Sequence, residues 1–530
     1  MMTITELQQR YAAHPNVEAM SGLLKNPSVR TLFCGGLCAS AASLFSSVLV
    51  QRGEFPFVFI LGDLEEAGYF YHDLTQVLGT DKVLFFPSSF RRAIKYGQKD
   101  AANEILRTEV LSRLQKGEEG LCVVTYPDAL AEKVVSRKEL GDKTLKLHSG
   151  ENVDTNFIME VLRSYGFEYV DYVYEPGQYA VRGSIIDVFS FSSEFPYRID
   201  FFGDEVESIR TFEVETQLSK EKKDSIVIVP DLSRSLEQGG ASGMVSFLDF
   251  LSADTVLAMR DLLWLRERIQ TVHDETLTPQ AIAAREAEES GCITLDGKLI
   301  DGSEFTLRAL DFRRMEFGNK PTGTPDATIT FDTSAQPIFR KNFDMVAESF
   351  KEYMEKGYAL YICSDSMKQT DRIRAIFEDR GDQIAFTAVE RTLHEGFADN
   401  ALRLCIFTDH QLFDRFHKYN LKSDKARSGK VALSLKELNQ FTPGDYVVHT
   451  DHGVGRFSGL VRIPNGDTTQ EVMKLVYQNE DVVFVSIHSL HKVSKYKGKD
   501  GEAPRLNKLG TGAWEKLKER TKTKIKDLSL

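Results

Sequence analysis

Cysteine is scarce in this sequence, and the six cysteines are scattered over 530 residues without forming a C-x-x-C pair. This spacing predicts neither a zinc ribbon nor a disulfide framework. Cys34 and Cys38 flank a glycine-rich turn, where we expect small apolar residues rather than a redox pair.

No apolar run approaches the roughly 18 residues that span a membrane, and the N-terminus lacks a signal core. We therefore expect a cytoplasmic protein without membrane contact.

Lysine is missing where a phosphate-binding loop needs it. The stretch GLCASAAS has the frame of G-x-x-x-x-G-K-[ST], with Gly36 as the first glycine and Ser43 as the final hydroxyl. Ala41 replaces the second glycine, and Ala42 replaces the lysine that reaches the β- and γ-phosphates. The loop is therefore predicted to be degenerate and non-functional, and we expect no cofactor and no catalytic residue in this chain.

The candidate metal site is built from histidines. His449 and His452 form one H-x-x-H pair, and His488 and His491 form another in the same predicted β-module. Four imidazoles could bind a metal ion, but no cysteine is near and few carboxylates support them. Turn and surface histidines are the preferred interpretation, so no metal is predicted.

The chain is longer than one hydrophobic core supports, so several domains are expected. Apolar strands alternating with amphipathic helices predict α/β domains with buried parallel sheets, whereas short alternating strands predict α+β and all-β modules. The patterns predict a multidomain α/β protein with these parts: an α/β domain at 1–143, an α+β insert at 144–216, the remainder of the first region at 217–320, a second α/β domain of unassigned role at 325–430, a compact all-β module at 436–498 and a helix at 506–530. Because the helical pattern runs uncapped to the last residue, we expect the natural chain to continue.

The charge is unevenly distributed. The net charge of −12 argues against DNA binding through the field of the whole chain. Residues 488–530, however, carry 12 Lys and Arg against 5 Asp and Glu. This basic end indicates either a local anionic partner or an ordinary solvated face, and both stay open.

A first candidate docking surface lies in PYRIDFF, residues 196–202. Strand alternation places Ile199 and Phe201 on a core face, and Arg198 and Phe202 on the opposite, solvent-facing side. Arginine beside an exposed aromatic ring is the composition of interface hot spots. Arg182, on a neighbouring predicted strand, could join them. The alternative is an ordinary Arg–Asp surface pair with a half-buried phenylalanine.

A second candidate lies in QEVMKLVYQNEDVVFVSI, residues 470–487, which predicts two strands around a turn. If the first strand is a sheet edge, its backbone can pair with a strand of another protein. The side chains of Val472, Met473 and Lys474 would then set specificity. The alternative is an internal hairpin of a small barrel.

Three stretches carry a family resemblance. EPGQYAVRGSIIDVFSFSSEFPYRIDFFGDEVESIRTFE (175–213) resembles a module that the excision-repair protein UvrB shares with transcription-repair coupling factors. FTPGDYVVHTDHGVGRFSGL (441–460) is similar to the CarD-like, RNA-polymerase-interacting domain, a Tudor- or SH3-like barrel. LNKLGTGAWEKLKERTKTKIKDL (506–528) resembles the helix that joins this domain to a motor. The order is that of the Mfd family of transcription-repair coupling factors, so the resemblance covers essentially the whole chain.

The resemblance implies a role in transcription-coupled DNA repair. Members of this family recognise RNA polymerase stalled at DNA lesions, displace it with an ATP-driven double-stranded-DNA translocase of helicase type, and recruit UvrA for nucleotide excision repair. The motor, with its ATP, its Mg²⁺ and most of the DNA contact, is expected after residue 530. This chain would supply docking modules without an ATPase, and residues 36–43 would be the relic of a UvrB-like loop.

The resemblance also implies the partner contacts. UvrA is expected to contact Arg182, Arg198 and Phe202 of the α+β insert. Met473 is expected to be the central contact of the RNA polymerase β subunit. That subunit would pair with the strand formed by Glu471, Val472, Met473, Lys474 and Leu475.

Two other functions stay open. One is an active nucleotide-dependent DNA-processing enzyme of UvrB type, which requires a phosphate loop that works without lysine. The other is a transcription regulator of CarD type, which leaves residues 1–430 without a role.

Overall fold

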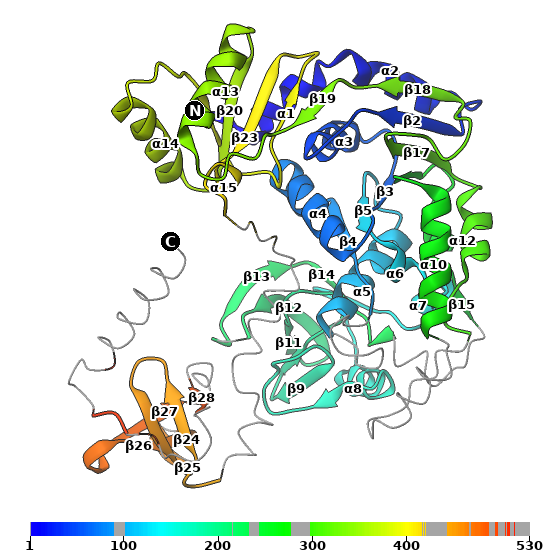
Figure 1. The fold of residues 1–530 in the computed structure, drawn as a ribbon. Coiled ribbons are helices and arrows are strands. Elements are labelled where there is room, and N and C mark those ends of the chain that lie inside the picture. Colours follow the sequence, from blue (N-terminus) through cyan, green and yellow to red (C-terminus); the bar gives the residue numbers. More distant parts are fainter. Residues whose placement is uncertain are drawn as a thin grey trace. The chain divides into compact units, whose positions relative to one another are not determined.

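The computed structural model describes residues 2–89, 101–214, 216–232, 243–276, 297–415, 417, 419, 442–465, 468–486, 493–496, 504, 506–508 and 514 (Figure 1). The chain forms two compact units. The first contains residues 1–144 and 231–421, and the second contains residues 145–230 and 422–530.

A seven-stranded parallel sheet forms the larger part of the first unit, in the order β18-β2-β17-β16-β3-β5-β4. Its strands are β2 (Thr31–Gly35), β3 (Phe57–Ile60), β4 (Val83–Phe86), β5 (Cys122–Thr125), β16 (Val256–Met259), β17 (Arg313–Gly318) and β18 (Ala327–Thr330). Every residue of β3, β4, β5 and β16 is buried, as in sheets covered on both faces.

The helices of this part alternate with its strands. They are α1 (Ile4–Ala12), α2 (Pro15–Lys25), α3 (Ala41–Arg52), α4 (Leu64–Leu78), α5 (Ala101–Gln115), α6 (Pro127–Leu130), α7 (Arg137–Asp142), α10 (Leu262–Thr276) and α12 (Gly302–Ala309), with the short strands β6 (Val134–Val135) and β15 (Met244–Val245) and the turn η1 (Phe247–Phe250). Asp63 caps α4 by accepting the amide of Glu66. Gly53 ends α3 in a left-handed conformation.

A second sheet completes the first unit, in the order β1-β21-β20-β23-β22-β19. Its strands are β1 (Met2–Thr3), β19 (Thr333–Ala335), β20 (Ala359–Ser364), β21 (Thr387–Glu390), β22 (Phe397–Asp399) and β23 (Leu404–Thr408), with helices α13 (Phe343–Glu355), α14 (Met367–Asp379) and α15 (Asp409–Leu412). β1 pairs with β21 of this sheet, while β18 pairs with β2 of the other. The predicted division at 320–325 is therefore wrong for β18, because an apolar run does not reveal which sheet a strand joins.

The insert in the second unit is a six-stranded sheet in the order β13-β12-β11-β10-β9-β8, accompanied by α8 (Thr155–Ser164). Its strands are β8 (Glu168–Tyr169), β9 (Gln178–Arg182), β10 (Ile185–Val188), β11 (Tyr197–Phe202), β12 (Glu205–Phe212) and β13 (Ser219–Lys223); β14 (Ser225–Ile228) pairs with β7 (Leu145–His148). Ile199 and Phe201 lie in the core with Ile158 and Leu162 of α8, so the predicted alternation of β11 is confirmed. The predicted end at 216 falls before β13, whose charged sequence SKEKK has no strand pattern.

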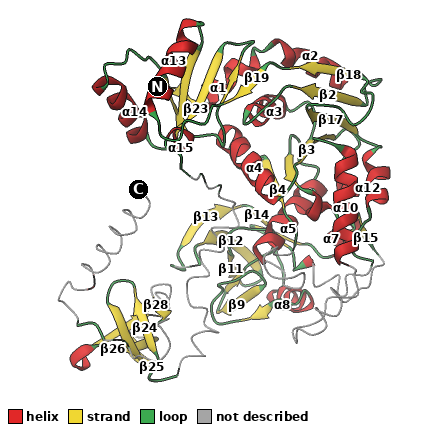
Figure 2. Cartoon of the chain, viewed as in Figure 1, coloured by secondary structure: helices red, strands yellow, loops and turns green. Residues whose placement is uncertain are grey.

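The second unit also contains an antiparallel sheet in the order β27-β26-β25-β24-β28. It consists of β24 (Tyr446–His449), β25 (Gly453–Asn465), β26 (Thr468–Val476), the turn η3 (Gln478–Glu480), β27 (Val482–Ser486) and β28 (Val493–Lys495), and Figure 2 shows these described elements as strands apart from η3. The expected multidomain α/β architecture with a C-terminal antiparallel sheet is confirmed. The predicted linker at 421–430 and most of the predicted helix at 506–530 lie outside the described residues.

Gly36 and Gly53 share a left-handed backbone but differ in how closely the surrounding chain approaches them. Gly36 has a φ of +82°, and a Cβ there would lie 2.0 Å from the carbonyl oxygen of Phe331. Gly53 has a φ of +65° with no atom within 4 Å of such a Cβ. Both alanine variants cost about 1 kcal/mol for the left-handed backbone, but only Gly36→Ala must also displace a neighbouring backbone. We expect Gly36→Ala to lose at least about 2 kcal/mol more than Gly53→Ala, measured by urea unfolding; equal losses would contradict the packing described.

Candidate functional site

The glycine-rich loop after β2 is held by the chain segment that leaves β18. The amide of Cys38 donates to Oγ1 of Thr333 over 3.1 Å, and that hydroxyl donates to the carbonyl of Gly36 over 2.6 Å. The ring of Phe331 packs edge-on against Phe45 of α3, with centroids 4.5 Å apart. The Cys34 thiol is buried, and burial raises its pKa. The loop is therefore packed by a neighbouring segment.

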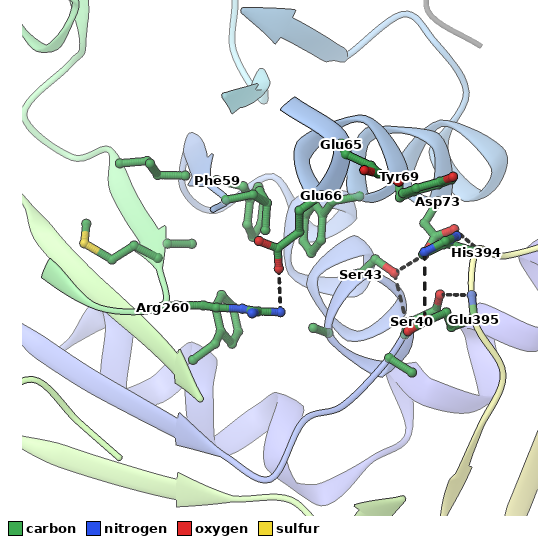
Figure 3. A pocket seen from close by; sticks show the side chains of 18 of the residues that line it. Ser40, Ser43, Phe59, Glu65, Glu66, Tyr69, Asp73, Arg260, His394 and Glu395 are labelled. Atoms are coloured by element: carbon green, nitrogen blue, oxygen red, sulfur yellow. Dashed lines mark hydrogen bonds and ion pairs between the residues drawn. The ribbon is translucent and has the colours of Figure 1, made fainter. Parts of the chain in front are cut away.

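Ser43, which stands at the Mg²⁺-binding position of the loop pattern, makes an internal hydrogen bond. Its hydroxyl donates to Asp73 of α4 over 2.7 Å, and the other oxygen of Asp73 accepts the amide of His394 over 2.7 Å (Figure 3). The amide of Glu395 donates to the hydroxyl of Ser40 over 2.9 Å. Burial raises the pKa of the Asp73 carboxyl to about 6, although these hydrogen bonds oppose the shift. Residues 394–395 are thus tied to the loop and to α4.

A cavity of about 390 Å³ lies beside the loop, at the carboxyl ends of β3 and β16. Its described charged lining is acidic except for one arginine and consists of Asp63, Glu65, Glu66, Asp73, Arg260 and Glu395. Arg260 is itself paired with Glu66 over 2.5 Å. Burial and the neighbouring imidazoles lower the pKa of His394 to about 4, so this ring adds no cation at neutral pH. The residues present therefore do not fit a nucleoside triphosphate, because nothing in the described lining replaces the missing lysine.

Arg182 and Arg198 meet at Asp187, a residue that the sequence patterns did not single out. Asp187 is fully buried and lies opposite Arg198 in the register of β10 and β11. Arg198 donates to both carboxylate oxygens over 2.8 and 2.9 Å, and Arg182 donates to one of them. Hydrogen bonding to Asp187 raises the pKa of Arg198. A charge within the buried strand IIDV, opposite an arginine, was the signal that could have revealed this residue.

The surroundings of the two arginines are unequal. The guanidinium of Arg198 lies over the ring of Phe212 at 4.5 Å and donates to the carbonyl of Gln217, which leaves its side chain 16% exposed. The Arg182 side chain is 33% exposed and lies over the ring of Tyr172. Both arginines pair with the fully buried Asp187 and not in an ordinary surface pair, and this carboxylate fixes both guanidinium groups on one face of the sheet.

Phe202 stands at the end of β11, just before the turn at Gly203. It is 78% exposed, whereas the preceding Phe201 is 4% exposed in the core. The alternative of a half-buried phenylalanine is therefore wrong. The Phe202 ring therefore gains nothing from the protein's own core.

The strand predicted to be a free edge in the C-terminal sheet is an interior strand. β26 pairs with β25 on one side and with β27 on the other, and Met473 is fully buried. The prediction that Glu471–Leu475 forms the pairing edge is wrong, and the alternative of an internal hairpin is observed. Both strands are mostly apolar, VMKLV apart from Lys474 and VVFV throughout, so their pattern does not reveal which one stays unpaired. Among the described strands of this sheet, β27 and β28 lie at the two edges, and on β27 Val482 is 39% and Phe484 is 50% exposed.

The histidine pairs do not form a described metal site. The rings of His449 and His452 stack with centroids 4.6 Å apart, while His488 and His491 lie outside the described residues. Among the residues that the structure describes, no three His, Cys, Asp or Glu side chains are placed to hold a metal ion.

Within the same residues, no helix has the length and apolarity needed to cross a membrane.

Two parts of the chain match families of docking domains. Residues 145–233 match the UvrB interaction domain, and residues 441–497 match the CarD-like/TRCF RID domain. The first match covers the insert sheet with Asp187 and Phe202, and the second covers the sheet with β26 and β27.

The whole chain resembles transcription-repair-coupling factors. It is 22% identical over 566 residues to the transcription-repair-coupling factor of Bacillus subtilis (strain 168), and 23% identical over 561 residues to that of Staphylococcus aureus (strain USA300). Each comparison covers 93% of this chain and 47% of the relative, so the chain spans about half the length of the curated relatives it matches. The resemblance predicted from the sequence is confirmed.

Asp187 gives a direct test of the insert geometry. Asp187→Asn removes the charge that holds two arginines while keeping the size of the side chain. We expect a loss of about 2 kcal/mol in the free energy of unfolding, because a buried ion pair is broken but both arginines retain some solvent. The matched control is Asp200→Asn, which breaks the more exposed pair with Arg210. A control loss as large as that of Asp187→Asn in urea unfolding would contradict the assigned importance of Asp187.

Proposed function

We propose that this chain recruits UvrA and RNA polymerase in transcription-coupled DNA repair. The observation that carries the proposal is the presence of both docking domains in one chain, with a phosphate-binding loop that lacks its lysine. The acidic cavity beside that loop supports docking over catalysis and disfavours an active enzyme of UvrB type. A simple CarD-type regulator would leave the matched insert at 145–233 unused.

The proposed UvrA-binding surface consists of Arg182, Arg198 and Phe202. Asp187 holds the two guanidinium groups before any partner arrives, so little side-chain entropy is lost on binding. Phe202 adds a large exposed ring beyond these charges. Rigid arginines beside an aromatic anchor are typical of interface hot spots.

The proposed polymerase-binding surface is the edge strand β27 in place of the strand expected from the sequence. An edge strand offers unpaired backbone groups to a strand of a partner, and exposed side chains beside it give specificity. Phe484 and Val482 supply apolar contact, and the register places Lys474 of β26 directly opposite Phe484. Val472, Met473 and Leu475 of the neighbouring strand β26 are buried, and they support β27 from the interior of the sheet.

The activity of the longer relatives belongs to this proposal as well. We infer that the complete protein displaces stalled RNA polymerase with an ATP- and Mg²⁺-dependent double-stranded-DNA translocase outside residues 1–530. The loop at residues 36–43 would then be a UvrB-like relic, and the C-terminal sheet a Tudor- or SH3-like barrel. The cytoplasmic location stays a prediction.

Phe202 tests the UvrA surface. Phe202→Ala removes the exposed ring without touching the core, so the fold should be retained. We expect UvrA binding to weaken by about 30-fold, which corresponds to about 2 kcal/mol for a hot-spot residue, measured by calorimetric titration. Phe157→Ala on α8 removes another exposed phenylalanine of the same insert and serves as the control. Unchanged UvrA affinity of Phe202→Ala would refute the assignment.

Phe484 and Met473 together test the polymerase surface. Phe484→Arg changes an exposed side chain of the edge strand, and we expect it to abolish binding of the polymerase β subunit while the fold is kept. Met473→Arg buries an unpaired charge and is expected to unfold the module, at a cost above about 3 kcal/mol. Circular dichroism and pull-down assays distinguish the two outcomes. A folded Met473→Arg protein that alone loses polymerase would instead restore the original assignment to β26.

A further inference from the structure

Four histidines from separate segments of the first unit meet beside α4, and none belongs to the proposed docking surfaces. They are His72 of α4, His394 before β22, His410 of α15, and His417 after α15. Nε2 of His417 lies 3.2 Å from Nε2 of His72, and the rings of His417 and His410 stack at 4.4 Å with an interplanar angle of 17°. Nε2 of His410 lies 2.7 Å from the carbonyl oxygen of His394, to which it donates in the corresponding tautomer.

This cluster holds His417 and Tyr419, which follow α15, against α4. The hydroxyl of Tyr69 on α4 donates to the carbonyl of His417 over 2.8 Å. The ring of Tyr419 packs edge-on against Tyr69 and covers Gly68, where a Cβ would lie 2.4 Å from that ring. Tyr69 also stacks on His394, with centroids 3.5 Å apart, and both side chains are labelled in Figure 3. The anchored residues immediately precede the point where the chain enters the second unit at residue 422.

The contacts require neutral rings. Two facing ring nitrogens share one hydrogen bond only when one carries a proton and the other offers a lone pair. If both rings are protonated, two N–H donors face each other within a cluster of like charges. Burial, and next the neighbouring imidazoles, lower the pKa of His72, His394 and His417 to about 4, and burial also lowers that of His410.

The charged groups around the cluster come from every element packed against it: Glu65 and Asp73 of α4, Asp365 after β20, Glu395 after His394, Asp409 of α15, and Arg415. Asp365 favours protonated imidazoles and moderates the shift, although burial outweighs it. Asp73 hydrogen-bonds to the Ser43 hydroxyl and to the His394 amide, on the loop side of the cluster. Burial raises the pKa of the Asp409 carboxyl. Its protonation at low pH therefore favours the closed state and opposes the effect of the histidines.

We propose that these four histidines form a pH-operated latch, which holds His417 and Tyr419 on α4 when the rings are neutral and releases them when the rings are protonated. A histidine whose pKa is lowered in the closed state stabilises closure fully above its ordinary value of 6.5. That stability is lost as the pH falls from about 6.5 to about 4. Acidification thus frees His417 and Tyr419 from α4.

Hydrogen exchange of the full 530-residue chain tests the latch. The amide of Arg415 donates to the carbonyl of His410, so its exchange reports on release of the segment. After correction for intrinsic rates, we expect exchange at pH 5 to exceed that at pH 7.5 by about 30-fold if one histidine with a pKa shifted from 6.5 to about 4 takes up its proton on opening. EDTA in the buffer removes any metal that imidazoles could bind.

Matched variants distinguish the latch from general unfolding. The double variant His72→Gln and His417→Gln keeps polar side chains that do not titrate, and we expect the pH response to fall below 5-fold. His273→Gln changes a half-buried histidine of α10 that lies outside the cluster and pairs with Asp274, and it should behave like the parent. The latch is refuted if the parent shows no rise at pH 5. It is also refuted if the double variant keeps the full response, or if amides of β5 rise in parallel with Arg415.

Discussion

The approach of Gly36 to the carbonyl of Phe331 is the constraint on which the first unit depends. After β18 has paired with β2, the chain passes over the loop at Phe331 and enters the other sheet as β19. The N-terminal β1 joins that same sheet from the opposite end of the sequence. An early strand, β1, therefore joins the later sheet, and a later strand, β18, joins the earlier sheet, so the two sheets form one compact unit. The backbone at Phe331 lies so close to the loop that position 36 must be a residue without a Cβ.

The sequence patterns predicted those features that depend on local periodicity. The alternation in PYRIDFF correctly placed Phe201 in the core and Phe202 in solvent, because one strand with one buried face imposes a period of two. The edge of the C-terminal sheet could not be predicted in this way. Whether β26 or β27 stays unpaired depends on which of them pairs with the preceding strand β25, and the apolar pattern of either strand suits the interior. Asp187 was missed for a similar reason, since its partners lie on two other strands.

The two proposed docking surfaces place exposed groups on rigid supports by different means. In the insert, a fully buried carboxylate orients arginines that remain partly exposed, and the adjacent Phe201 anchors the strand that presents Phe202. In the C-terminal sheet, the buried Met473 and Val485 lie opposite one another and hold β27 against β26. If the proposed surfaces are correct, substitutions at the supports act through stability, whereas substitutions at the exposed groups act on binding.

The loop that lacks its lysine is packed against residues 394–395, and His394 also belongs to the histidine cluster. A working phosphate loop must keep its backbone amides and its lysine open to an anion. Here a separate segment packs against the loop, because the amides of His394 and Glu395 donate to Asp73 and to the Ser40 hydroxyl. A bound triphosphate would face Asp73, Glu65 and Glu395 across a partly desolvated cavity, where like charges repel strongly. The segment that packs against the loop also carries the imidazole that stacks on Tyr69, so this packing also positions His394 within the proposed latch.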